Sequence, residues 1–463
     1  MKRKYIRKLK FLRIMVLLVG LLLFIALLRN PNIINRAIVL GAPQMLFILV
    51  SALIIFFGFM TIVRNLKKES EKLSKNKFTI KKLAYDGPMF QNDMTPQEDE
   101  EIDENSRFFM LNQIDRDAQI LRQKAFENEI TLKDICEEFR DFSASKLGLF
   151  YDISDIRRFI GGLAISHIMI LQGMSGTGKT SLAYAFGDYL KNPTVVVPIQ
   201  PMWKERTDLI GYYNEFTKKF NETTLLQKLY EASHNDQMYI TVLDEMNIAR
   251  VEYYFAEFLS LLELPDRKKR HLDVISDVWE TDPSLLKNGK LNLPNNMWFI
   301  GTANNDDSTF SISDKVYDRA MVINLDKKAT PFIANDVSSR SISADKFEEL
   351  VIHAQKSYAL SHRNLRRLKQ FDKYLMTHFQ ITFGNRIMQQ IKNYVPVIVA
   401  CGGTELSALD DIMSKKVLRK LETKNMVYVK SAAPGLISFI DELFGDGQMA
   451  LCREYIEQIE INA

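Results

Sequence analysis

Cysteine and histidine are scarce in this sequence, with three cysteines and six histidines in 463 residues. Cys136, Cys401 and Cys452 are far apart, and none of them forms a CxxC pair or lies beside clustered histidines. A structural zinc site needs four closely spaced ligands, and a disulfide framework needs paired cysteines. The composition therefore argues against both, and it fits a reducing, cytosolic setting for the globular part.

A strong excess of one charge is also missing. The formal net charge is +4, which is too small by itself to indicate a nucleic-acid partner. The chain has no internal repeat that would predict a solenoid. Its length of 463 residues allows two or three domains and a sizeable core.

Two long apolar runs stand near the N-terminus, at about 11–28 and 45–63. A membrane-spanning helix needs roughly 20 apolar residues, a length that the second run reaches and the first reaches only with its flanks. A cleaved signal peptide is the alternative for the first run, but no small-x-small cleavage pattern follows Leu28. The sequence thus predicts a two-helix transmembrane hairpin within residues 1–64.

Basic residues flank this hairpin on both outer sides, whereas the loop between the runs carries only Arg29 and Arg36. Positive charge stays cytoplasmic, so we expect a two-span membrane protein with both termini in the cytoplasm. The clusters also suit contact with anionic lipid headgroups. The basic residues are Lys2, Arg3, Lys4, Arg7, Lys8, Lys10 and Arg13 before the first run, and Arg64, Lys67, Lys68, Lys72, Lys75 and Lys77 after the second.

The rest of the chain divides into three parts. Residues 65–112 are basic and then acidic with few apolar positions, which predicts a solvated linker. Residues 113–326 begin with helical periodicity and then alternate short apolar strands with helices, a pattern typical of a parallel α/β sheet. Helical periodicity dominates 327–463 and predicts a helical lid. The expected strands are 168–172, 194–198, 238–243, 297–300 and 321–325.

The strongest motif lies between the first expected strand and an amphipathic helix, and it matches GxxxxGK[ST]. Glycines allow backbone N–H groups to surround phosphates, and the helix that opens at Lys179 adds its positive dipole end. We expect Lys179 to reach the β- and γ-phosphates and Thr180 to bind Mg²⁺. The predicted phosphate-binding residues are Gly173, Met174, Ser175, Gly176, Thr177, Gly178, Lys179, Thr180 and Ser181.

Two further strands end in polar residues. The strand at 238–243 ends in Asp244 and Glu245, which predicts Asp244 as a Mg²⁺ ligand and Glu245 as the base that polarises the attacking water. The strand at 297–300 is followed by Asn304, which is suited to orient that water or contact the γ-phosphate. Helix capping is the alternative for the acidic pair and a polar turn for the asparagine. Their order after the P-loop favours the catalytic interpretation.

Arg319 stands just before the last expected strand, in the run Asp314 to Arg319. An arginine here is placed to supply positive charge to the γ-phosphate of a neighbouring subunit. A surface ion pair between Asp318 and Arg319 or another residue is the alternative interpretation.

This order of motifs, followed by a helical lid, resembles the AAA+ ATPases and is most similar to their McrB-like and MoxR-like (dynein-related) branch. The resemblance covers about 142–421 and rests on 171–180, Trp203 with 208–213, 244–247 and 301–304. It implies rings, usually hexamers, with ATP and Mg²⁺ between subunits and Arg319 acting in trans. It also implies a sensor-2 arginine at a helix start, where Arg386 fits and Arg363 and Arg366 are alternatives.

The sequence also departs from that branch. Ala303-Asn304-Asn305 replaces a frequent Met-Asn-Thr, so GTP specificity is not carried over and ATP is expected, without excluding GTP. Arg319 stands alone where many relatives have consecutive arginines. Residues 263–296 form an insertion with a basic stretch at 267–271. In this branch such hairpins can line the ring pore, and a basic loop suits phosphate backbones; a solvated surface turn is the alternative.

Two functions use such a site. The first is a membrane-anchored ring motor that couples ATP hydrolysis to remodelling or translocation of a protein or nucleic acid. The second is a slow nucleotide-dependent switch or scaffold that assembles a partner effector at the membrane, such as an McrC-like nuclease or a phage-defence module. The resemblance implies that a protein partner is encoded nearby. A small-molecule kinase would need an acceptor pocket, which no motif indicates.

Overall fold

The computed structural model describes residues 106–462, except 122–124, 128, 305–308 and 327–328. The described residues all belong to one compact unit, 102–463. Within them no helix is long and apolar enough to span a bilayer. The predicted hairpin (1–64) and most of the predicted linker (65–112) lie outside the described residues.

A five-stranded parallel sheet forms the centre of the described unit, in the order β2-β5-β8-β1-β9. Each strand coincides within a few residues with an expected one, so the predicted parallel α/β core is confirmed. β1 is an interior strand because β8 and β9 pair with its two sides, and β8 is the middle strand of the five. The strands are β1 (Ile168–Gln172), β2 (Val195–Pro198), β5 (Tyr239–Asp244), β8 (Met297–Ala303) and β9 (Met321–Asn324).

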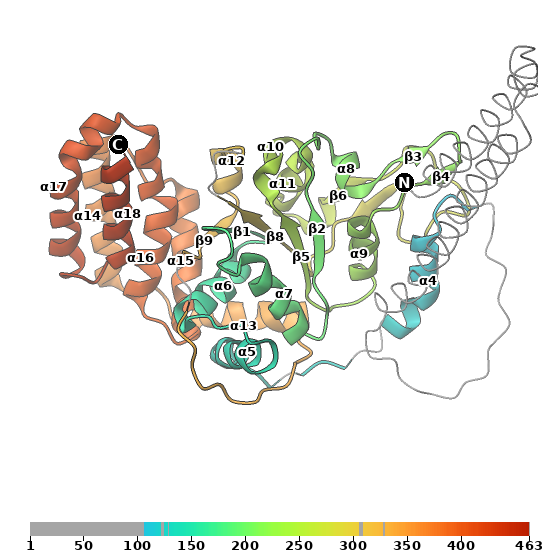
Figure 1. Cartoon of the computed structure of the whole chain (residues 1–463), viewed down its shortest axis with the longest axis horizontal. Coiled ribbons are helices and arrows are strands. Elements are labelled where there is room, and N and C mark those ends of the chain that lie inside the picture. Colours follow the sequence, from blue (N-terminus) through green and yellow to red (C-terminus); the bar gives the residue numbers. More distant parts are fainter. Residues whose placement is uncertain (1–105, 122–124, 128, 305–308, 327–328, 463) are drawn as a thin grey trace, which may run out of the picture. The chain divides into compact units, whose positions relative to one another are not determined.

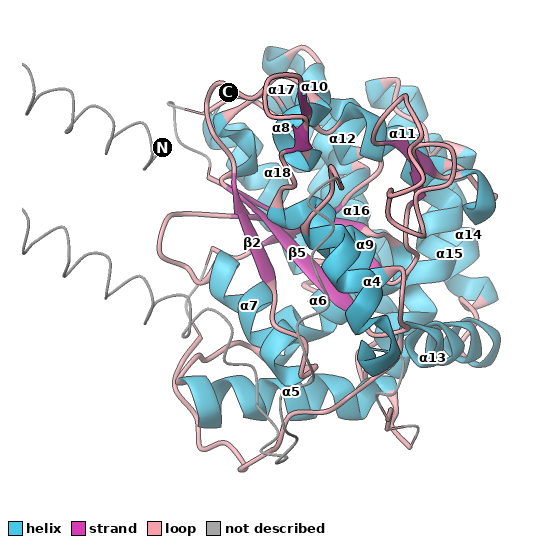
Figure 2. Cartoon of the chain, turned by 90° about the vertical axis from the view of Figure 1, so that its right-hand side faces the viewer, coloured by secondary structure: helices cyan, strands magenta, loops and turns pink. Residues whose placement is uncertain are grey.

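Helices cover both faces of the sheet, because successive side chains of each buried strand point to opposite faces. Figure 1 shows one group on each side, and Figure 2 shows α5 and α7 on one side of β2 and β5. The helices of the first layer share an apolar cluster with Ile170 and Phe299 of the sheet. They are α4 (Met110–Leu121), α8 (Arg206–Ile210), α9 (Thr224–Ala232), α10 (Val251–Tyr254), α11 (Ala256–Glu263) and α12 (Asp314–Tyr317). The helices of the second layer share a cluster with Leu171 and Ile300, and they are α5 (Leu132–Leu147), α6 (Ile153–Ile165), α7 (Lys179–Tyr189) and α13 (Ala344–Ser357).

Short elements interrupt the first layer. A hairpin of β3 (Tyr213–Asn214) and β4 (Lys219–Phe220) follows α8. The insertion expected at 263–296 contains the 3₁₀ turn η2 (Arg267–Lys269) and a second hairpin, β6 (His271–Asp273) with β7 (Lys290–Asn292). Another 3₁₀ turn, η1 (Met246–Ile248), follows β5.

The helical C-terminal region is also present, and it has its own core. Buried residues of five helices and one 3₁₀ turn, with Leu368, Ile391 and Leu409 at the centre, form a third apolar cluster. By contrast α13, the first helix after β9, buries Phe347 and Val351 against the sheet. The elements of the third cluster are α14 (His362–Phe379), α15 (Asn385–Ala400), α16 (Glu405–Lys416), η3 (Leu418–Thr423), α17 (Met426–Phe444) and α18 (Ala450–Asn462).

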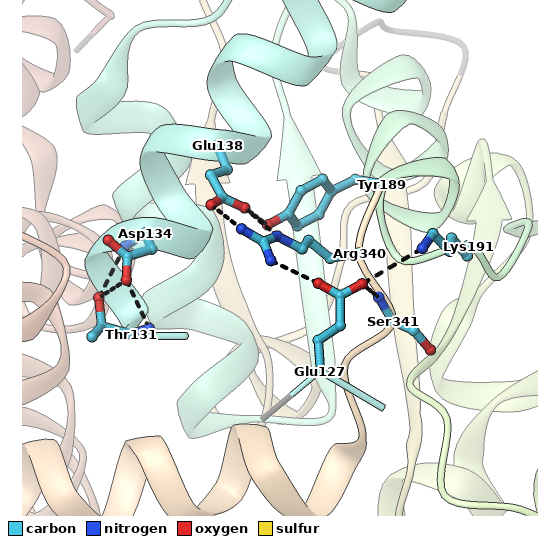
Figure 3. A network of polar contacts seen from close by, with 8 residues as sticks. All are labelled: Glu127, Thr131, Asp134, Glu138, Tyr189, Lys191, Arg340 and Ser341. Atoms are coloured by element: carbon cyan, nitrogen blue, oxygen red, sulfur yellow. Dashed lines mark hydrogen bonds and ion pairs between the residues drawn. The ribbon is translucent and has the colours of Figure 1, made fainter. Parts of the chain in front are cut away.

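An arginine fixes the long connection between β9 and α13 (Figure 3). The guanidinium of Arg340 donates to both carboxylate oxygens of Glu138 on α5, at 2.6 and 2.8 Å, and to Glu127 at 2.7 Å. The Tyr189 hydroxyl donates to Glu138 at 3.1 Å, and the Arg340 amide donates to the Tyr189 carbonyl at 2.7 Å. Planar two-point pairing of this kind is the stronger form of ion pair, so it holds the connection against α5 and the end of α7.

Candidate nucleotide-binding site

The P-loop joins the end of β1 to the start of α7. Gly173, Gly176 and Gly178 have φ of 140°, 78° and 92°, in the region that favours glycine. A Cβ atom on Gly173 would lie 2.5 Å from the Leu325 carbonyl oxygen and 3.1 Å from a carboxylate oxygen of Asp326. The tight turn after β1 therefore depends on glycine both for its conformation and for its close approach to the end of β9.

The side chain of Lys179 is buried inside this loop. Its Nζ donates to the carbonyls of Gly173 and Met174 at 2.9 and 2.8 Å, and the Thr177 hydroxyl donates to the Met174 carbonyl at 3.0 Å. The ammonium group thus lies within the loop itself, at the N-terminal end of α7, where an anion is favoured. Met174, Ser175 and Gly176 are exposed at the loop tip, and Ser181 lies in the first turn of α7.

The sheet order brings Asp244 to Thr180. Because β1, β8 and β5 are neighbours in a parallel sheet, their carboxyl ends meet at one edge, the usual place for a ligand. The hydroxyls of Thr180 and Thr302 both donate to Oδ1 of Asp244 at 2.9 Å. The Thr302 hydroxyl also accepts from the Glu245 amide at 2.9 Å. Thr302 therefore orients both acidic residues, a role that we did not assign from the sequence although a buried threonine in an apolar strand was visible there.

Glu245 adopts a left-handed backbone conformation, with φ 52° and ψ 47°, and its side chain is exposed. A non-glycine residue in this region carries a strain of order 1 kcal/mol, and such residues gather at functional sites. The amide bond to Thr302 helps to hold this conformation. Glu245 directly follows Asp244, and its side chain is exposed at the carboxyl end of β5.

Asn304 lies directly after β8 at the same edge, and Asn247 holds its backbone. The side-chain amide of Asn247 donates to the Asn304 carbonyl and to the Thr309 hydroxyl, both at 2.9 Å. Asn247 is buried on η1, two residues after Glu245. Asn247 therefore links the turn that carries Glu245 to the loop that begins at Asn304. In the sequence it was only a member of the 244–247 motif, with no role of its own.

A tyrosine also contacts the P-loop. The Tyr151 hydroxyl donates to the Gly178 carbonyl at 3.1 Å. Burial raises the pKa of the Tyr151 phenol well above its ordinary value, so the hydroxyl stays a neutral donor at physiological pH. Nothing in the local sequence pattern indicated this contact, because 27 residues separate the two partners.

These residues fit a magnesium nucleotide. A hydroxyl and a carboxylate, at Thr180 and Asp244, are the hard oxygen ligands that Mg²⁺ takes together with phosphate oxygens and waters. Lys179 and the start of α7 supply the positive groups that a triphosphate requires. The predicted residues from Gly173 to Ser181, with Asp244, Glu245 and Asn304, are thus brought to one edge of the sheet.

Arg319 and Arg386 lie elsewhere. Arg319 pairs with Glu263 at 2.5 Å, and Arg386 pairs with the same carboxylate. Both arginines line an open groove of about 850 Å³ together with Ser166, His167 and Asn296, which stand just before β1 and β8. The expected sensor-2 arginine is therefore placed with the finger candidate at the amino ends of the strands, and not beside the P-loop that follows β1.

The separation can be estimated along β1. The Ser166 hydroxyl donates to the Arg319 carbonyl at 2.9 Å, at the amino end of the strand. Gly173 follows the other end, and at roughly 3.3 Å per residue the two points are about 20 Å apart. An arginine side chain does not span that distance, so Arg319 does not reach the nucleotide of its own subunit.

Comparison with known proteins gives a family match over the residues of this site. Residues 168–320 match the model of the AAA domain (dynein-related subfamily), and residues 338–461 match a domain of unknown function (DUF8727). No curated protein matches the chain. Among solved structures it resembles a "putative ATPase" from Cytophaga hutchinsonii, with 14% identity over 68% of this chain and 93% of that chain and a TM-score of 0.43. It also resembles a full-length MCM homolog from Methanopyrus kandleri, with 9% identity over 69% and 62% of the two chains and a TM-score of 0.35.

The family match covers the P-loop between β1 and α7, and it also covers the acidic pair at the end of β5. The site therefore lies within the residues that match the dynein-related AAA domain, and the chain is an ATPase.

Proposed function

We propose that this ATPase works as a membrane-anchored AAA+ ring of six subunits, in which each hydrolytic site is completed by the next subunit and hydrolysis remodels a bound protein. The observation that carries the proposal is the position of Arg319, about 20 Å from the P-loop of its own subunit at roughly 3.3 Å per strand residue. In a head-to-tail ring, the amino ends of the strands of one subunit can face the carboxyl ends of the strands of the next subunit.

Within one subunit, Lys179 would hold the β- and γ-phosphates and Glu245 would polarise the attacking water. Thr180 and Asp244 would hold Mg²⁺, which neutralises charge on the phosphates. Arg319 of the neighbouring subunit would stabilise the charge that develops on the γ-phosphoryl oxygens. Since Glu263 pairs with Arg319 and Arg386 in the described subunit, a neighbour's phosphate would compete with Glu263 for these two arginines.

Exposed apolar side chains support a protein substrate. Phe216, in the turn of the β3–β4 hairpin, is 99% exposed, and Met202 is 85% exposed. Large apolar side chains in water favour contact with apolar parts of a partner. The basic turn at 267–271, which we considered for nucleic acid, instead pairs internally: Arg267 binds Glu348 at 2.8 Å, and the Arg270 guanidinium donates to the Leu264 carbonyl.

The ring is tested by nucleotide-dependent assembly. Glu245→Gln should trap bound ATP, so the detergent-solubilised full chain should shift from small species to a closed oligomer on ATP addition, as measured by light scattering coupled to size-exclusion chromatography. Lys179→Ala, carried through the same experiment, should remain small because it lacks bound phosphate. If the Glu245→Gln chain stays monomeric at saturating ATP, the proposed ring assembly is wrong.

The membrane anchor is tested separately. We propose that both termini and the ATPase domain face the cytoplasm, because basic residues flank the two apolar runs on their outer sides. Protease added outside intact cells should leave tags at both ends uncut, whereas the same protease should cut them after the cells are permeabilised. Cleavage near Glu98 from outside would reverse the proposed topology.

A further inference from the structure

The segment that carries Arg319, residues 314–320, lies between β1 and the C-terminal helices; we call it the finger segment. On the sheet side, Val316 is fully buried in the first cluster and the Arg319 carbonyl accepts from Ser166 at 2.9 Å. The Tyr317 hydroxyl contacts the side chain of Gln172 at the far end of β1. The finger segment is thus anchored near both ends of β1.

The C-terminal helices hold its other side. Lys416, the last residue of α16, donates from Nζ to the Tyr317 carbonyl at 2.5 Å and to the Ala320 carbonyl. These two carbonyls bracket Asp318 and Arg319. Arg419 adds an ion pair with Asp314 at 2.7 Å, and its guanidinium lies 3.5 Å from the centre of the Tyr317 ring.

The burial of Lys416 in this position is unfavourable in free energy. It is 6% exposed, and burying an ammonium group costs free energy unless polar groups compensate it. Desolvation lowers the pKa of Lys416 to about 7, although the nearby charge of Asp318 raises it. An apolar side chain would fill the same space without this cost, so packing alone does not account for a lysine.

We propose that Lys416 is a positioning residue for Arg319: its two hydrogen bonds fix the backbone on both sides of the arginine, and so set the direction in which Arg319 is presented to the neighbouring subunit. This inference rests on the proposed trans role of Arg319. It makes the docking of α16 on the finger segment a condition for hydrolysis in the next subunit, so that a movement of the C-terminal helices is transmitted around the ring.

The test compares Lys416→Met, Arg319→Ala and the double variant in the full solubilised chain. Lys416→Met removes both hydrogen bonds while keeping a side chain of similar length. We expect kcat to fall at least about tenfold, a part of the roughly 10³ to 10⁵ that a supplied arginine is worth, while KM for ATP stays near the wild-type value. The double variant should be no slower than Arg319→Ala, because both changes remove one function.

Two further variants make the result specific. Lys424→Met is the matched control, since Lys424 also donates to a carbonyl, that of Gln380, but away from the finger segment; its kcat should be unchanged. Lys416→Gln keeps an N–H donor and should be faster than Lys416→Met, which also covers the case in which the methionine variant does not fold. Wild-type kcat in both Lys416 variants, or a loss that adds to that of Arg319→Ala, would overturn the positioning role. Wild-type kcat in Arg319→Ala would instead overturn the trans finger.

A pH profile supplies a readout that a purely structural role would not move. The charged groups that face Lys416 are Asp318, Arg419 and Arg386. As pH rises through about 7 the ammonium becomes a neutral amine and a weaker donor, so wild-type kcat should fall. The free energy of unfolding should change in the opposite direction, because the folded pKa is lower than the unfolded pKa and the unfolded chain therefore binds more protons above pH 7. Lys416→Met should lack both slopes, and a kcat profile identical to that of the wild type would count against the proposal.

Discussion

Lys179→Ala should bind ATP at least about a hundredfold more weakly than the wild type, because the lost interactions are charge-assisted hydrogen bonds to phosphate. The Nζ atom is already held inside the P-loop by the Gly173 and Met174 carbonyls, so little ordering is needed when phosphate arrives. Alanine retains the helix start of α7 but leaves the loop without its cation. The substitution should therefore remove affinity rather than the fold.

Thermal unfolding in the presence of ATP measures this without turnover. A ligand that binds only the folded state raises the unfolding temperature, so the wild type should be stabilised by ATP and Lys179→Ala should not be. Lys133→Ala provides a control, since Lys133 is an exposed helix lysine whose ion pair with Glu137 at 3.7 Å lies on the surface of α5. Undiminished ATP stabilisation of Lys179→Ala would refute the P-loop assignment.

The elements of the core were predictable because their signals are local. Each strand is a short apolar run, and the P-loop and the acidic pair follow strand ends, so period and position were enough to place them. The predicted strand at 297–300 was too short, because Gly301 is a poor strand former and interrupts the apolar run, whereas β8 continues to Ala303. Burial between β1 and β5 decides the extent of β8, and this is a property of the sheet order and not of the local sequence.

The parts of the site that could not be predicted depend on contacts between distant elements. Thr302 reaches Asp244 across 58 residues, and Lys416 reaches the Ala320 carbonyl across 96. Arg386 fits the position of a sensor-2 arginine in the order of motifs, but the docking of α15 brings it to Glu263, 123 residues away. The spacing of the motifs identified Arg386 as a candidate, but it gave no information on whether that arginine lies at the amino or the carboxyl ends of the strands.

Arg319→Ala and Glu245→Gln should each bind ATP nearly normally and hydrolyse it at least about a hundredfold more slowly. A supplied arginine is worth roughly 10³ to 10⁵ in rate, and a positioned general base is worth roughly 10² to 10⁴. The two substituted residues lie at opposite ends of the strands, because Glu245 follows β5 and Arg319 precedes β9. In a head-to-tail ring, one site uses Glu245 of one subunit and Arg319 of the next.

Mixing the two inactive variants should therefore restore activity. In a ring assembled at random from equal amounts, about one junction in four pairs an intact Glu245 with an intact Arg319, so roughly a quarter of the wild-type rate is the upper expectation. A mixture of Asp244→Asn with Glu245→Gln is the control: both residues serve the same side of the junction, each subunit lacks one of them, and no junction becomes complete. If mixed rings form and the first mixture is as inactive as the second, then Arg319 does not act in trans. Restored activity in the first mixture alone would require that the two edges of the sheet, about 20 Å apart at roughly 3.3 Å per residue, meet between subunits and not within one.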